Sequence, residues 1–115
     1  MFQNLFSKKD RALKNLSQGE WKSLLDEKDG AIILDVRTPE EWAEGIIPGA
    51  KKLNIMDRAA FSTGISKLDP EQPVFLYCRS GGRSGQAGNL MEAQGFKELY
   101  NLKGGMMMWR GEVSK

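Results

Sequence analysis

The sequence predicts a single α/β domain with a central, mainly parallel sheet of about five strands and helices on both faces. Short runs of consecutive apolar residues, such as Val74–Tyr77, are typical of strands that are covered on both faces. These runs alternate along the chain with segments that carry helix-start signals, which indicates a parallel α/β arrangement. The chain has 115 residues, which fits one ordinary domain and is too short for two.

The beginning of the chain predicts an N-terminal arm over residues 1–12, followed by the domain over residues 13–115. The arm is polar and basic and shows no clear apolar period. Charges begin at Lys8, so no apolar run there is long enough for a signal peptide, and no segment of the chain approaches transmembrane length. We therefore expect a cytoplasmic protein that has no membrane partner.

The first helix is expected over residues 18–27. Ser17, with Glu20 three residues later, forms a capping box ahead of the apolar helix face. Gly30 then ends the helix, and residues 31–34 form the first buried strand.

The middle of the chain predicts smaller elements. Pro39 suits a first helical position and starts a short helix through residue 44. A short strand is expected around residues 52–54. Residues 57–68 are weakly helical and are interrupted by Gly64, which predicts short helical turns in place of one helix.

The last third of the chain predicts a strand, a long helix, a strand and a short helix. The strand Val74–Tyr77 leads into a loop and then into a helix over residues 83–94, which contains good helix formers. A strand is expected near residues 98–101. Two glycines then open a short helix over residues 106–109, whose methionines are expected to fill the core and not to bind a metal.

The loop between the strand Val74–Tyr77 and the helix 83–94 carries the candidate chemistry. Cys78, the only cysteine of the chain, opens this loop. Unpaired N–H groups and the helix dipole favour an anion at a helix N-terminus, so we expect Cys78 to be the nucleophile and to be a thiolate near neutral pH. The plain alternative is an inert buried cysteine.

The rest of the loop predicts a cradle for an anion. Two glycines allow successive backbone N–H groups to turn inward, and two arginines and two serines can donate further hydrogen bonds to a small anionic sulfur donor. The expected substrate-binding residues are Arg79, Ser80, Gly81, Gly82, Arg83 and Ser84.

Composition narrows the chemistry further. The net charge is +2, and the Lys and Arg residues are scattered along the chain, which does not favour nucleic acid as a partner. A single cysteine excludes an internal disulfide and an internal resolving thiol, so turnover needs an external acceptor. The chain has no histidine, which excludes a Cys-His dyad and the commonest zinc ligand. We expect neither a metal nor a cofactor.

Three segments resemble the rhodanese-like family of sulfurtransferases, and the resemblance covers about residues 17–111. They are the run from Leu34 through Trp42 to Ala50, the loop from Cys78 to Ser84, and the run from Leu102 to Trp109. The resemblance implies that Cys78 accepts sulfane sulfur from a donor such as thiosulfate, becomes a persulfide, and passes the sulfur to cyanide or to a thiol. A sulfur-relay protein is a further expected partner. Residues 13–115 are then a rhodanese-like domain.

The same resemblance assigns a supporting role to Asp35 and Arg37. Asp35 is expected to orient an arginine of the loop. The alternative for these two residues is a structural ion pair that closes the strand.

Two other functions compete with this interpretation. Cysteine-dependent phosphatases and arsenate reductases also wrap an oxyanion in a Cys-to-Arg loop, but theirs is one residue longer than the loop from Cys78 to Arg83, which has four residues between the two. The other alternative is a non-catalytic sulfur-carrier or protein-interaction module. Intact Cys78 and Arg83 do not separate an enzyme from a carrier.

Overall fold

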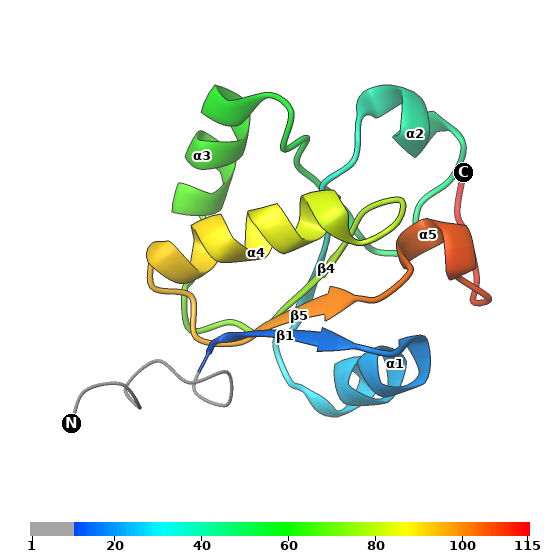
Figure 1. Ribbon diagram of the computed structural model, residues 1–115, viewed down its shortest axis with the longest axis horizontal. Coiled ribbons are helices and arrows are strands. Elements are labelled where there is room, and N and C mark those ends of the chain that lie inside the picture. Colours follow the sequence, from blue (N-terminus) through cyan, green and yellow to red (C-terminus); the bar gives the residue numbers. More distant parts are fainter. Residues whose placement is uncertain (1–10) are drawn as a thin grey trace.

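The computed structural model describes residues 11–115, and it has an α/β fold with a five-stranded sheet (Figure 1). The strand order is β1-β5-β4-β2-β3, and all neighbouring strands are parallel. The strands are β1 (Leu13–Leu16), β2 (Ile32–Asp35), β3 (Lys51–Lys52), β4 (Val74–Tyr77) and β5 (Leu99–Leu102). The predicted fold class is confirmed.

Helices cover both faces of the sheet. The helices are α1 (Gln18–Glu27), α2 (Pro39–Ala43), α3 (Arg58–Ser66), α4 (Gly82–Ala93) and α5 (Gly105–Met108). Side chains of α3 and α4 pack in one apolar cluster with the sheet, and α1 packs in a second cluster together with residues of and next to α5. The predicted helices over 18–27 and 83–94 therefore form, as does the predicted capping box of α1. Helix α2 begins with a capping box of its own, formed by Thr38 and Glu41.

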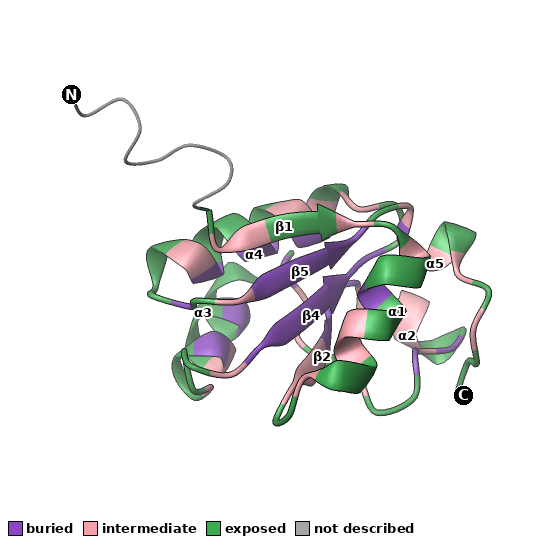
Figure 2. Ribbon diagram, turned by 90° about the horizontal axis from the view of Figure 1, so that it is seen from below, coloured by how far each residue is buried: buried purple, intermediate pink, exposed green. Residues whose placement is uncertain are grey.

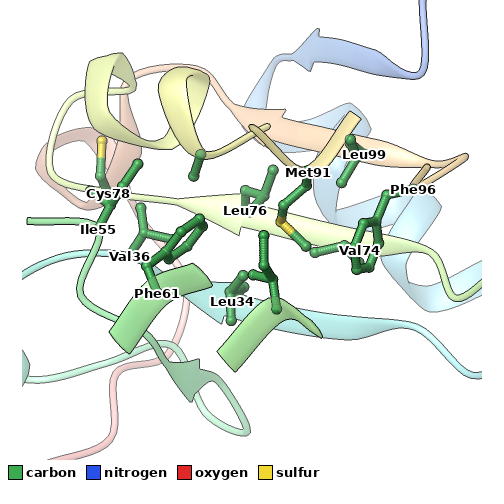
Figure 3. Close-up of a cluster of buried hydrophobic side chains, with 12 residues drawn as sticks. Leu34, Val36, Ile55, Phe61, Val74, Leu76, Cys78, Met91, Phe96 and Leu99 are labelled. Carbon is green, nitrogen blue, oxygen red and sulfur yellow. The ribbon is translucent and has the colours of Figure 1, made fainter. Parts of the chain in front are cut away.

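Strand β4 lies in the middle of the core, and all four of its residues are buried, as Figure 2 shows. Successive side chains of a strand point to opposite faces. Val74 and Leu76 accordingly join the cluster under α3 and α4, whereas Phe75 and Tyr77 join the cluster under α1. Cys78 continues this alternation and lies at the end of the first cluster (Figure 3).

Strand β1 is an element that the sequence did not predict. It is a four-residue edge strand whose two central residues are exposed, so its apolar content is small. Arg11 and Ala12, which the sequence assigned to the arm, contact α4. Arg11 forms an ion pair of 2.6 Å with Glu92, and the Ala12 N–H donates to the same carboxylate at 2.7 Å. The rest of the predicted arm lies outside the described residues.

Helix α3 corrects the prediction for residues 57–68. It is one continuous helix of nine residues, with Asp57 as its N-cap. Gly64 lies within it, where a Cβ would stand 2.4 Å from a methyl carbon of Leu53. The glycine therefore permits close packing of the helix and does not interrupt it. No helix in the part of the chain that the structure describes is long and apolar enough to cross a membrane.

Candidate active site

Cys78 directly follows β4 at the carboxyl end of the sheet, where ligands bind in open parallel α/β folds. The chain then turns sharply into α4. Gly81 is the N-cap residue of α4 and has φ 111°, a left-handed conformation that favours glycine. Gly82, the other predicted cradle glycine, lies in the first turn of α4 without a positive φ, and a Cβ there would meet open space. Of the two cradle glycines, only Gly81 has a backbone conformation that favours glycine.

The Cys78 sulfur lies inside this turn. The Gly81 N–H donates to Sγ at 3.0 Å, the Ser84 Oγ lies 3.3 Å from Sγ, and Cys78 is 1% exposed. Burial raises the pKa of the Cys78 thiol, but hydrogen bonds from the Ser84 hydroxyl and from backbone N–H groups of the loop outweigh burial and lower the pKa below its ordinary value. This direction agrees with the expected thiolate.

The two loop arginines have different surroundings. Arg83 forms a bidentate ion pair with Glu41 of α2, at 2.7 Å and 2.9 Å. The Arg83 hydrogen bonds outweigh the effect of burial and lower the pKa of Glu41 to about 2. Arg79 is exposed and its side chain makes no hydrogen bond within the part of the chain described by the structure. The unpaired positive charge of the loop is therefore that of Arg79.

Asp35 does not orient a loop arginine, which corrects the prediction. Its carboxylate accepts hydrogen bonds from the Arg37 side chain at 2.8 to 3.1 Å and from the Arg37 backbone N–H at 3.0 Å. Arg37 also donates to the Gly45 carbonyl at 2.7 Å. Both charged residues are buried, where each charge needs its partner. The pair closes the end of β2, and Glu41 takes the role expected of Asp35.

Sequence reasoning did not identify Glu41 and Asn101 as site residues. Glu41 completes the capping box with Thr38. This local role explains the residue in the sequence and does not indicate that it also pairs with Arg83. Asn101 donates to the Gly81 carbonyl at 3.1 Å and accepts from the Ser84 hydroxyl. The sequence did contain a signal for Asn101, because it is a polar residue within the otherwise apolar strand β5. A buried polar side chain in such a strand needs hydrogen-bond partners.

Helix α5 holds the outer side of the loop through backbone contacts. The Met106 N–H donates to the Cys78 carbonyl and the Met107 N–H to the Arg79 carbonyl, both at 2.9 Å. Gly105 has φ 53°, and a Cβ there would lie 2.5 Å from the Cys78 carbonyl oxygen. Only Met106 of the three methionines packs against the core, whereas Met107 and Met108 are exposed. The expected core filling is therefore wrong for two of the three.

The site can hold a negative charge on the nucleophilic sulfur of Cys78. The N–H groups of the loop and the Ser84 hydroxyl are the donors, and the loop also carries the cations of Arg79 and Arg83. Among residues 11–115, no group of three or more His, Cys, Asp or Glu side chains is placed to hold a metal ion.

Comparisons with known proteins found similar sequences and similar structures. The profile of the family described as "Rhodanese-like domain" matches residues 17–112. A protein of Arabidopsis thaliana named "Rhodanese-like/PpiC domain-containing protein 12, chloroplastic" is 39% identical over 86 residues, which cover 74% of this chain but only 29% of that protein. "Thiosulfate sulfurtransferase GlpE" of Pseudomonas putida is 35% identical over 86 residues, covering 75% of this chain and 76% of that protein. The crystal structure of a rhodanese-like domain protein from Staphylococcus aureus superimposes with a TM-score of 0.75 at 32% identity, over 88% of this chain and 96% of the other.

Proposed function

Because the chain belongs to the rhodanese-like domain family, we propose that it transfers sulfane sulfur through a persulfide on Cys78. The observation that carries this proposal is the position of the Cys78 sulfur within hydrogen-bond distance of the Gly81 N–H and the Ser84 hydroxyl. Such donors stabilise a thiolate before the reaction, and backbone N–H groups of the loop can stabilise an anionic terminal sulfur after it.

Two displacements complete the proposed cycle. With thiosulfate as donor, the Cys78 thiolate attacks the outer sulfur atom, a new S–S bond forms, and sulfite leaves with the electron pair of the broken S–S bond. Cyanide or an external thiolate then attacks the terminal sulfur, and Cys78 leaves as a thiolate. Because Cys78 is the only cysteine of the chain, the acceptor in the second step is another molecule.

Charge supports a small anionic donor as the first substrate. Arg79, the residue after Cys78, is exposed and unpaired within residues 11–115, and Arg83 adds a second cation that Glu41 partly neutralises. Thiosulfate fits this environment, and the name of the relative from Pseudomonas putida also contains this donor.

The test is thiocyanate formation from thiosulfate and cyanide by the wild-type protein and by Cys78→Ser. We expect the wild type to be active and the variant to fall to the uncatalysed rate, because a serine hydroxyl is not ionised at neutral pH. Gln86→Ala is the matched control, since Gln86 is exposed on α4 and its side chain forms no hydrogen bond within residues 11–115. Full activity of Cys78→Ser, with an unchanged circular dichroism spectrum, would refute the proposal.

The Glu41–Arg83 ion pair favours a second candidate, a carrier that exchanges sulfur with a sulfur-relay protein and uses small anions poorly. Glu41 places a carboxylate close to the donor site, which weakens attraction for a free anion. Rates with thiosulfate and with a persulfidated protein donor separate the two. Faster transfer from the protein, with trace turnover of thiosulfate, would favour the carrier.

A further inference from the structure

The Ser84 hydroxyl has more acceptors within reach than it has protons. Its Oγ lies 3.3 Å from the Cys78 sulfur, 3.2 Å from the Gly81 carbonyl oxygen, and closest of all to Asn101 Oδ1. A hydroxyl donates one hydrogen bond at a time. At any moment, therefore, only one of these three contacts contains the hydroxyl proton.

The orientation of the Asn101 amide is fixed by its surroundings. Its Nδ2 lies 3.1 Å from the Gly81 carbonyl oxygen and 2.8 Å from Asn15 Oδ1. Because a carbonyl only accepts, the nitrogen must face Gly81, which places Oδ1 against Ser84. The Gly81 carbonyl also accepts from the Gly85 N–H at 3.0 Å, so both of its lone pairs are used. The real competitor of the sulfur for the Ser84 proton is Asn101 Oδ1.

We propose that Asn101 is a positioning residue that holds the Ser84 hydroxyl while the Cys78 sulfur is uncharged and releases the hydroxyl when the sulfur becomes a thiolate. In the thiol, S–H donates to Ser84 Oγ, and the hydroxyl donates to Asn101. When the S–H proton leaves to water, a hydrogen bond to the charged sulfur is the stronger one, and the hydroxyl turns to the sulfur.

The same exchange of hydrogen bonds affects the protein that carries a persulfide on Cys78. This part of the inference rests on the proposed function. In a persulfide the negative charge lies on the terminal sulfur, and Sγ is a neutral atom bonded to two partners. The hydroxyl of Ser84 then returns to Asn101. Asn101 therefore stabilises the thiol and the persulfide relative to the thiolate, and it keeps the thiolate from being held too firmly to react.

Asn101 is well placed for this role and carries no charge of its own. It is 4% exposed and reaches from β5 to the first turn of α4. The loop carries Arg79 and Arg83, the latter paired with Glu41, and the pair Asp35–Arg37 is buried at the end of β2. The elements that hold Asn101 and Ser84 are flanked by Lys14 of β1 and by Glu92 of α4, which pairs with Arg11. Substitution of Asn101 leaves all of these in place, so a change in ionisation reports on the hydrogen bonds.

The experiment measures the acid dissociation constant of Cys78 from the pH dependence of the thiolate absorbance in the ultraviolet. Asn101→Leu removes the competing acceptor at similar volume, and we expect a dissociation constant about three- to tenfold higher, that is, a lower pKa. In the Ser84→Ala background the same substitution should have no effect. Asn15→Ala is the matched control, because it removes the hydrogen bond between Asn101 and Asn15 and spares the contacts of Asn101 with Ser84 and with the Gly81 carbonyl.

Asn101→Ala carries the same expectation and replaces Asn101→Leu if the larger side chain prevents folding. A second readout is the ratio of sulfur-loaded to unloaded protein at a fixed ratio of thiosulfate to sulfite, measured at a pH at which Cys78 is a thiolate. This ratio should fall by a similar factor in the variant. A raised pKa would show that Asn101 merely holds the cradle together, and it would overturn the proposal. An unchanged dissociation constant of Cys78 in Asn101→Leu would also overturn the proposal. So would an equal shift of this constant in the Ser84→Ala background. If the wild type itself gains no sulfur from any donor, the proposed function fails, while the ionisation measurement still decides the role of Asn101.

Discussion

Replacement of Glu41 by glutamine removes the charge of the Glu41–Arg83 ion pair and leaves the rest of the site intact. The pair is bidentate, and the two side chains are 18% and 27% exposed. Glu41 Oε1 also accepts from the Thr38 N–H in the capping box of α2, and glutamine keeps an oxygen for that bond. The substitution therefore isolates the contribution of the charge.

The pKa of Glu41 gives the size of the effect. A fall from the ordinary value of 4.5 to about 2 corresponds to roughly 3 kcal/mol at 1.36 kcal/mol per pKa unit. Solvent reaches this pair, so we expect about 1–2 kcal/mol. Because the pKa is lowered in the folded state, this stability is present above about pH 4.5 and is lost as the pH falls toward 2.

Urea unfolding at about pH 7 and about pH 3 measures this difference. The wild type should lose about 1 kcal/mol more than Glu41→Gln between the two pH values, since only part of the stabilisation is lost by pH 3. Glu40→Gln is the control, since Glu40 is exposed in the same helix and forms no ion pair among residues 11–115. Equal losses in the wild type and in Glu41→Gln would refute the assignment of this pair.

Three further predictions concern the loop. Ser84→Ala should raise the pKa of the Cys78 thiol, because the thiolate loses a donor, and the pH profile of alkylation by iodoacetamide should move to higher pH; a profile at lower pH would contradict this. Arg79→Ala should raise KM for thiosulfate about tenfold with little change in stability. Steady-state kinetics measure this effect, with Gln86→Ala as the control variant. An unchanged KM would show that Arg79 does not belong to the donor site. Gly105→Ala should lower the free energy of unfolding by more than about 2 kcal/mol, because its Cβ would overlap the Cys78 carbonyl. Gly19→Ala is the control and should have no such effect, because a Cβ at Gly19 meets open space. Equal effects of the two substitutions would show that the contact at Gly105 is unimportant.

Sequence patterns located the elements that have strong local signals. The helix α1 has a capping box, and β4 is a continuous apolar run, so each could be recognised from neighbouring residues. Strand β1 could not, because an edge strand with Lys14 and Asn15 exposed carries little apolar signal. The continuity of α3 depends on the packing of Gly64 against Leu53, which sequence alone does not contain.

The same distinction holds in the candidate site. Cys78 and its loop are contiguous in the sequence, so their pattern pointed to an anion cradle. The partner of Arg83 is 42 residues away in the chain, and Asn101 is 17 residues away from Ser84. Which acid meets which arginine depends on side-chain directions at the ends of β2 and α2, and Asp35 turns back onto Arg37 instead.

Intact-protein mass spectrometry tests the proposed persulfide most directly. The protein is weighed before and after incubation with thiosulfate, and again after addition of cyanide. We predict a gain equal to one sulfur atom that cyanide removes and that Cys78→Ser does not show. A protein that gains no sulfur from thiosulfate, from polysulfide or from a persulfidated protein donor would contradict transfer through Cys78.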